Sequence, residues 1–181
     1  MTKRQIIPPV AMAVSIDAAR RAARASGTAL DAELEDKVRG ITEEVEHKIG
    51  RALITQTWEA ALDNFPVSRS IKLPMAPLAS VDHVKFVDVG GVQRTLDPQD
   101  YLADTKSAPG WLVLAPGCGW PATQPRVHAV EVQYVCGYGL TDANVPPAIK
   151  EYILGMLEHH YYPNPNAQHL ARRLDRFMVY S

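Results

Sequence analysis

The chain has 181 residues, of which 46% are hydrophobic and 22% charged, and its 19 basic and 20 acidic side chains leave a formal net charge of −1. This composition is typical of a globular protein and excludes a disordered or fibrous one, and the near-zero charge argues against a nucleic-acid binder that relies on a basic surface. No apolar run reaches the roughly 18–20 residues of a membrane span, so we expect no membrane association.

A chain of this length fits a single domain, residues 1–181. Its two cysteines, Cys118 and Cys136, form no CxxC pair and no disulfide framework, which indicates free thiols in a reducing compartment. Pro8-Pro9 interrupts the only apolar stretch near the N-terminus, so we expect no export signal and synthesis in the cytoplasm.

The first part of the chain is predicted to be helical because residues 10–65 contain no proline. Ser15 is a suitable N-cap for a helix over 16–25, and a longer helix begins at 28–31 and ends at Gly50. The apolar residues of the longer helix recur every three or four positions and predict one buried stripe: Leu34, Val38, Ile41, Val45 and Ile49.

The middle of the chain is rich in proline, and its apolar residues change to a period of two. Gly90-Gly91 can supply the positive φ of a tight hairpin turn between two of the expected strands. The predicted strands are 55–63, 71–73, 81–87, 92–96, 111–114 and 127–136. We therefore expect an antiparallel β segment with long turns.

The last part returns to helical patterning after Pro146-Pro147, a dipeptide suited to a helix start. The first helix there has an apolar stripe made by Ile149, Tyr152, Ile153, Met156, Leu157 and His160. A final amphipathic helix is expected over 167–178. The predicted fold is α+β: a mainly helical core of two N-terminal and two C-terminal helices (about 15–50 and 145–178) carrying a large antiparallel β insertion (about 54–139).

Candidate chemistry is sparse. Phosphate-binding glycine loops and metal-ligand spacings are missing from the sequence, so we expect no catalytic residue, cofactor or metal. The alternative is a small hydrolase or metal-dependent enzyme that uses Cys118 with His128, or the pair His159 and His160. A carbohydrate- or peptide-binding module remains a further alternative, and it would need an exposed aromatic platform around Trp111 or Trp120.

Taken in order, several segments of the chain resemble the head–tail connector (adaptor, or head completion) proteins of tailed bacteriophages. The resemblance covers roughly residues 9–178 and lies in the order and spacing of the segments. The matching segments are Val14-Ser15-Ile16-Asp17-Ala18-Ala19, Gly50-Arg51-Ala52-Leu53-Ile54-Thr55-Gln56-Thr57-Trp58, Leu73-Pro74-Met75-Ala76-Pro77-Leu78, Val87 to Val92, Leu96 to Tyr101, Trp120-Pro121-Ala122-Thr123, Val135-Cys136-Gly137-Tyr138-Gly139 and Val145 to Lys150.

The resemblance implies a non-enzymatic virion protein, made in the host bacterium and located at the head–tail junction of a phage or prophage particle. Its subunits would form a ring, of twelve copies in the virion, on the portal protein. The ring would extend the DNA channel, let DNA pass without specific binding, and dock the next connector or stopper protein on the tail side.

A ring needs two complementary patches on each subunit, because its interfaces are heterologous. The C-terminal stretch is the first candidate, since aromatic residues with arginines nearby are typical of interfaces. Its residues are Tyr161, Tyr162, Arg172, Arg173 and Arg176. The tip of the Gly90-Gly91 hairpin is the second candidate. The sequence also allows the final helix to pack on its own subunit with its arginines in water.

Overall fold

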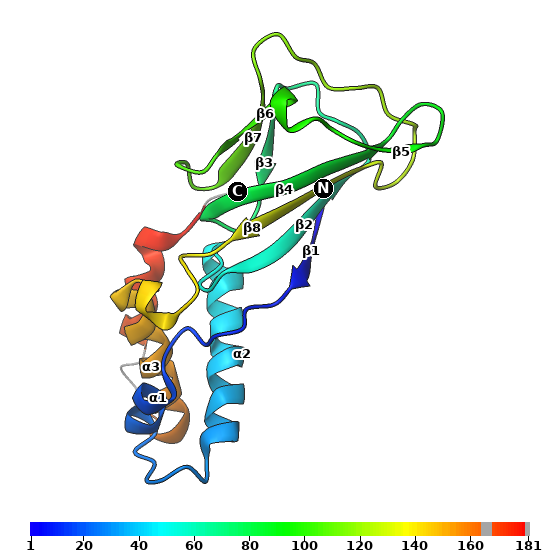
Figure 1. Cartoon of the computed structure of the whole chain (residues 1–181). Helices are drawn as coiled ribbons and strands as arrows, with labels where there is room; N and C mark the ends of the chain where they lie inside the picture. Colours follow the sequence, from blue (N-terminus) through cyan, green and yellow to red (C-terminus); the bar gives the residue numbers. More distant parts are fainter. Residues whose placement is uncertain (164–167, 180–181) are drawn as a thin grey trace. The chain divides into compact units, whose positions relative to one another are not determined.

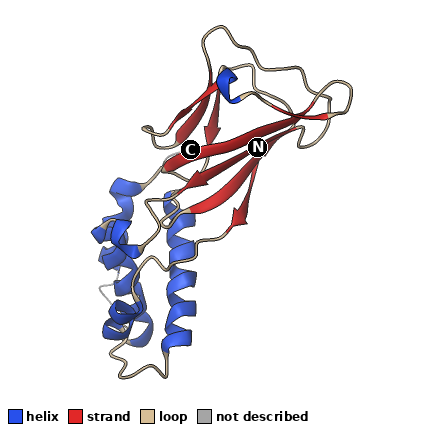
Figure 2. Cartoon of the chain, viewed as in Figure 1, coloured by secondary structure: helices blue, strands red, loops and turns tan. Residues whose placement is uncertain are grey.

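The computed structural model describes residues 1–163 and 168–179 and divides the chain into two compact units of similar size (Figure 1). The strand unit consists of Met1–Pro8 and Gln56–Gly137, and the helical unit of Pro9–Thr55 and Tyr138–Ser181. Figure 2 shows that strands and α-helices are segregated between these units.

The described residues of the strand unit form two antiparallel sheets. The larger sheet has the order β1-β2-β8-β4-β5, with β1 at Thr2–Ile7, β2 at Gln56–Leu62, β8 at Val130–Cys136, β4 at Leu78–Val87 and β5 at Gln93–Thr95. The smaller sheet has the order β3-β7-β6, with β3 at Ser70–Leu73, β7 at Gly110–Leu114 and β6 at Tyr101–Asp104. A short 3-10 helix, η1 (Pro98–Asp100), precedes β6.

Strand β8 lies at the centre of the larger sheet, and its side chains alternate between buried and half-buried positions, as the sequence predicts. Tyr134 is fully buried there, and its hydroxyl donates a hydrogen bond to the carbonyl of Pro74 at 2.7 Å. Burial raises the pKa of Tyr134 because the phenolate would lose its hydration. The strand unit therefore has a core of its own, which includes Ile71, Leu73, Leu78, Val84, Phe86, Leu112, Val130 and Val132.

The helical unit packs its helices around a second apolar core. Its α-helices are α1 (Ile16–Ala22), α2 (Asp31–Ile49), α3 (Pro147–Tyr161) and the short α4 (Gln168–Ala171); its 3-10 helices are η2 (Asp142–Asn144) and η3 (Arg172–Phe177). The buried side chains of this core include Leu34, Val38, Val45, Ile49, Leu53, Ile149, Ile153, Leu157 and Leu174.

Helix α2 confirms most of the predicted stripe. Four of its five members are buried, and Ile41 is half-buried at the edge of the core. Gly50 ends the helix in the left-handed region at φ 68°, where glycine carries no Cβ penalty. The stripe does not mark Glu46, whose carboxylate is buried and accepts a hydrogen bond from the backbone N–H of Leu53 at 2.6 Å.

The predicted helical core with a β insertion is wrong, although the chain is α+β. Strand β1 comes from the N-terminal residues and pairs with β2, so the β structure begins before the first helix. The two sheets also build a separate core as large as that of the helices, rather than decorating it. The architecture follows from two separate cores, because the sheets and the helices each bury their apolar faces among themselves.

Smaller differences have local causes. Strands β1 and β6 have no apolar alternation, so neither was expected from the sequence. Helix α1 ends at Ala22, earlier than the predicted position 25. The helix expected over 167–178 is a single α-turn, α4, followed by η3. Residue 167 of that expected helix lies outside the described residues. His160 is exposed instead of lying on the buried stripe of α3. The Ser15 cap is confirmed: its hydroxyl accepts a hydrogen bond from the N–H of Ala18.

Candidate assembly interface

The C-terminal segment packs against the helical unit to which it belongs. Leu174 is fully buried in the helical core, and Phe177 is half-buried beside it. Two polar contacts fix the end of the segment: the Arg51 guanidinium donates to the carbonyl of Phe177 at 2.6 Å, and the N–H of Val179 donates to the carbonyl of Ile49 at 2.9 Å. The apolar side of η3 is therefore used within the subunit.

The three arginines of η3 lie on its other side and are exposed. Arg173 forms an ion pair with Glu151 of α3, and the guanidinium of Arg176 lies 4.8 Å from the ring centroid of Phe177. Among the described residues, Arg172 has no carboxylate partner. An arginine surface on a segment held by Leu174 is thus available to a partner.

The two predicted tyrosines stand at the end of α3 and contact other parts of the helical unit. The Tyr161 hydroxyl donates a hydrogen bond to the Glu33 carboxylate at 2.7 Å, and this bond raises the pKa of Tyr161. The ring of Tyr162 is 41% exposed and lies 4.3 Å from the guanidinium carbon of Arg24. Tyr162 therefore keeps surface for a partner, whereas Tyr161 mainly ties α3 to α2.

The hairpin tip between β4 and β5 is organised by Asp88. One of its carboxylate oxygens accepts hydrogen bonds from the N–H groups of Gly90 (2.9 Å) and Val92 (3.0 Å), and the other accepts from the Arg94 guanidinium at 2.8 Å. Gly91 has φ 80°, the left-handed conformation that the sequence predicted for this turn. These bonds lower the pKa of Asp88, with the Arg94 bond as the main cause.

Exposed valines surround this tip, a feature that the sequence analysis missed. Val89 and Val92 flank the glycine pair, and the loop that carries Val127 lies against β4, where the N–H of Gln124 donates to the carbonyl of Val87 at 3.0 Å. A shallow hollow of about 530 Å³ opens beside Val127. The turn signal marks where the hairpin lies, and the valines next to it could have indicated an apolar tip.

Cys118 and His128, the residues of the alternative cysteine enzyme, contact different partners. The Cys118 thiol donates to the Asp100 carboxylate at 3.4 Å, and this bond together with desolvation raises the pKa of the thiol, which disfavours the nucleophilic thiolate. The Nε2 atom of His128 lies instead 3.3 Å from the Thr2 hydroxyl, and its backbone N–H donates to the Asp63 carboxylate at 3.0 Å.

The histidine pair is equally unsuited to a metal. His160 is exposed and packs edge-on against the ring of Tyr161, while His159 is its neighbour on α3 and points elsewhere, as adjacent helical residues must. Within residues 1–163 and 168–179, no group of three His, Cys, Asp or Glu side chains could hold a metal ion.

Trp120, a residue of the aromatic platform that a binding module would need, makes contacts within the strand unit. The ring of Trp120 stacks on that of Phe65 at 4.8 Å between centroids, and its indole N–H donates to the carbonyl of Ser68 at 2.8 Å.

Among the helices that the structure describes, none is long and apolar enough to cross a membrane.

Comparison with known proteins gives matches at the level of structure. No family model matches the chain, and no curated protein matches it in sequence. It is similar to a chain in the neck of an empty gene transfer agent (GTA) particle computed with C6 symmetry, with TM-score 0.83 and 19% identity. It is also similar to chains in the virion of a native GTA particle (TM-score 0.81, 19% identity) and in the neck of a native GTA particle computed with C12 symmetry (TM-score 0.71, 20% identity).

Each of these matches covers 100% of this chain and 97% of the other chain. The chain therefore has, in both of its units, the fold of a chain from the neck of a GTA particle. This finding agrees with the resemblance to connector proteins that the sequence indicates.

Proposed function

We propose that the chain is a structural protein of a phage or prophage-derived particle and works as a head–tail connector subunit. The observation that carries the proposal is the full-length fold match to a particle-neck chain with TM-score 0.83. Both units of this chain take part in that match, which covers 100% of this chain and 97% of the neck chain.

In this role the subunits form a ring on the portal protein at the head–tail junction. The GTA necks were computed with sixfold and twelvefold symmetry, which supports a ring of twelve copies for this chain. The ring extends the DNA channel, and the net charge of −1 suits a wall past which DNA moves without binding. The tail-side face of the ring docks the next connector or stopper protein.

The test is assembly with the portal of the same particle. The purified chain, alone over a range of concentrations and mixed with portal, would be followed by native mass spectrometry and electron microscopy. We expect a ring of twelve subunits seated coaxially on the portal. A chain that stays monomeric at every concentration and leaves the portal bare would contradict the proposal.

A further inference from the structure

Helix α2 has an outer face that stays exposed among the described residues of the helical unit. With about 100° between successive residues, the side directly opposite the stripe of Leu34, Val38 and Val45 carries Asp36, Gly40, Glu43 and His47, and Glu44 lies beside it, towards Tyr152 of α3. All five are exposed. The basic residues of α2 lie on the flanks of this face, and Lys48 leans back to within 5.9 Å of the Tyr152 ring centroid.

Gly40 in the middle of this face has no explanation within the subunit. A Cβ built on it would meet nothing within 4 Å, and its φ needs no glycine. Glycine weakens a helix interior relative to alanine, so its use at an open position is a cost to the isolated chain. A glycine does permit another chain to approach the helix backbone closely.

The carboxylates around Gly40 also lack an ion-pair partner within the described part of the chain. Asp36, Glu43 and Glu44 form no ion pair with any residue that the structure describes. Three exposed arginines of the same unit also form no ion pair with a carboxylate in the described part of the chain. They are Arg21 of α1 and Arg172 and Arg176 of η3.

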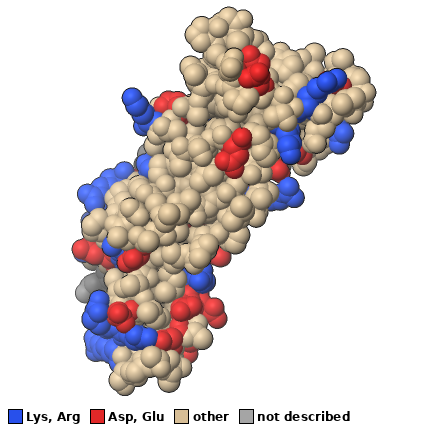
Figure 3. Space-filling view, viewed as in Figure 1, with Lys and Arg blue, Asp and Glu red and all other residues tan. Residues whose placement is uncertain are grey.

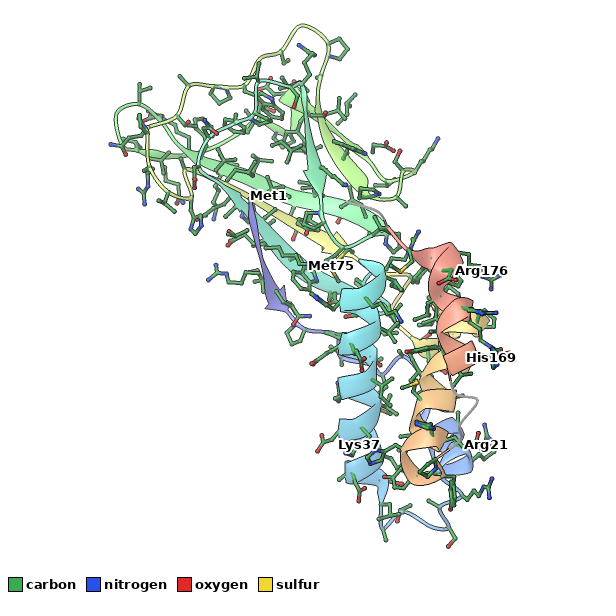
Figure 4. All side chains as sticks on the ribbon, turned by 180° about the vertical axis from the view of Figure 1, so that it is seen from behind. Met1, Arg21, Lys37, Met75, His169 and Arg176 are labelled. Atoms are coloured by element: carbon green, nitrogen blue, oxygen red, sulfur yellow. The ribbon has the colours of Figure 1, made fainter. Side chains whose placement is uncertain are left out.

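These arginines lie away from the outer face of α2. Figure 4 places Arg21, His169 and Arg176 along one side of the helical unit and Lys37 of α2 on the other. In Figure 3 basic side chains predominate on the left of the helical unit, and acidic side chains gather at the lower right, where α2 lies. Carboxylates without a described ion pair thus predominate on the α2 side of the unit and arginines without one on the side of α1 and η3, with Arg39 of α2 and Asp175 of η3 as exposed exceptions.

We propose that neighbouring subunits of the ring join through these two surfaces, the acidic face of α2 (Asp36, Gly40, Glu43 and Glu44) on one copy and the arginine face (Arg21, Arg172 and Arg176) on the next. The occupant of each surface is a second copy of this chain, because complementary charges on opposite sides of one subunit give a head-to-tail contact. This inference rests on the ring proposed above and adds the residues that close it.

Two neutralised variants test the contact. The acid variant is Asp36→Asn with Glu43→Gln and Glu44→Gln, and the arginine variant is Arg21→Gln with Arg172→Gln and Arg176→Gln. Each variant alone should fold and lose the ring, because every contact then lacks one charged surface. An equal mixture should stop at heterodimers, since each dimer has one intact contact and a neutral surface at either end. Native mass spectrometry measures the copy number.

Charge reversal provides the complementary test. One variant combines Asp36→Lys, Glu43→Lys and Glu44→Lys, and the other combines Arg21→Glu, Arg172→Glu and Arg176→Glu. Each variant alone should abolish rings. Their mixture should restore rings with the two variants alternating. The control, Lys106→Gln with Arg126→Gln in the strand unit, removes exposed positive charge elsewhere and should leave rings intact.

Gly40→Gln separates assembly from stability. The longer side chain should raise the melting temperature of the monomer, because it replaces a helix glycine, while it reduces ring formation by blocking close approach. If the unmodified chain forms rings and the neutralised variants form them equally well, this inference is overturned and the connector function stands. If the unmodified chain forms no ring with its portal, the connector function itself fails.

Discussion

Gly155 of α3 lies directly beneath Leu170 of α4: a Cβ built on Gly155 would come within 2.8 Å of Cδ1 of Leu170. A Cβ at that distance would force the Leu170 side chain to move, so the present packing of Leu170 against α3 depends on the absence of a side chain at Gly155. Leu174, one turn further along, is fully buried as a result of the same packing. Apolar packing at Leu170 and Leu174 therefore helps to hold the segment that carries the arginines of η3, together with the polar contacts of Arg51 and Val179.

Gly155→Val should detach the C-terminal segment from α3. The valine methyls would displace Leu170 and withdraw Leu174 from the core, at a cost of about 2–4 kcal/mol in the free energy of unfolding. Urea denaturation followed by circular dichroism measures the loss. The matched control is Gly40→Ala on the open face of α2, which should stabilise the isolated chain by about 0.5–1 kcal/mol.

Deletion of residues 166–181 is a poor test of the arginines for the same reason. It removes the buried Leu174 along with them and exposes apolar core, so we expect a lower melting temperature and aggregation. A truncated chain that melted like the full chain would show that the segment contributes nothing to the core. Single arginine substitutions avoid this ambiguity.

The stripe of α2 predicts graded losses of stability. Leu34→Ala should cost about 2–5 kcal/mol because the side chain is fully buried, and Ile41→Ala should cost clearly less because Ile41 is only half-buried. Glu43→Ala should stay within about 0.5 kcal/mol, since the side chain is exposed. Equal costs at Leu34 and Glu43 in chemical denaturation would show that the buried face is misassigned.

Glu46 should matter more than a surface carboxylate. Glu46→Ala leaves the buried N–H of Leu53 without that acceptor, which should cost about 1–3 kcal/mol. Glu46→Gln keeps an oxygen acceptor at the same position and should recover part of the loss. The two variants are compared by thermal melting, and identical melting points for both would argue against a role for the hydrogen bond.

The hairpin tip should loosen in acid. Because the folded-state pKa of Asp88 is lowered from the ordinary 3.8, its contribution to stability is complete above about pH 4 and is lost as the pH falls through the lower folded-state pKa. Arg94→Gln should move the titration of Asp88 upward, towards 3.8. NMR of the Asp88 carboxyl and of the Gly90 and Val92 amides follows both effects; a midpoint above 3.8 in the unmodified chain would contradict them.

The sequence by itself determined the elements whose burial is periodic. The stripe of α2, the stop at Gly50 and the alternation of β8 follow from residue spacing, because one face of each element packs against a core. The order of the segments also indicated a connector-like protein, which the fold comparison supports. The arginines of η3 were marked as surface candidates by residue type and are exposed.

Only the tertiary structure decided the rest. Every residue of β1 is exposed, so its strand conformation comes from backbone pairing with β2, which no side-chain period records. The hydrogen bond of Glu46 depends on where the chain places Leu53 after the helix ends, and the packing of Leu170 depends on Gly155 in the preceding helix. Contacts outside the residue's own helix or strand set all three, because such hydrogen bonds and close packing form only once the chain has folded back on itself.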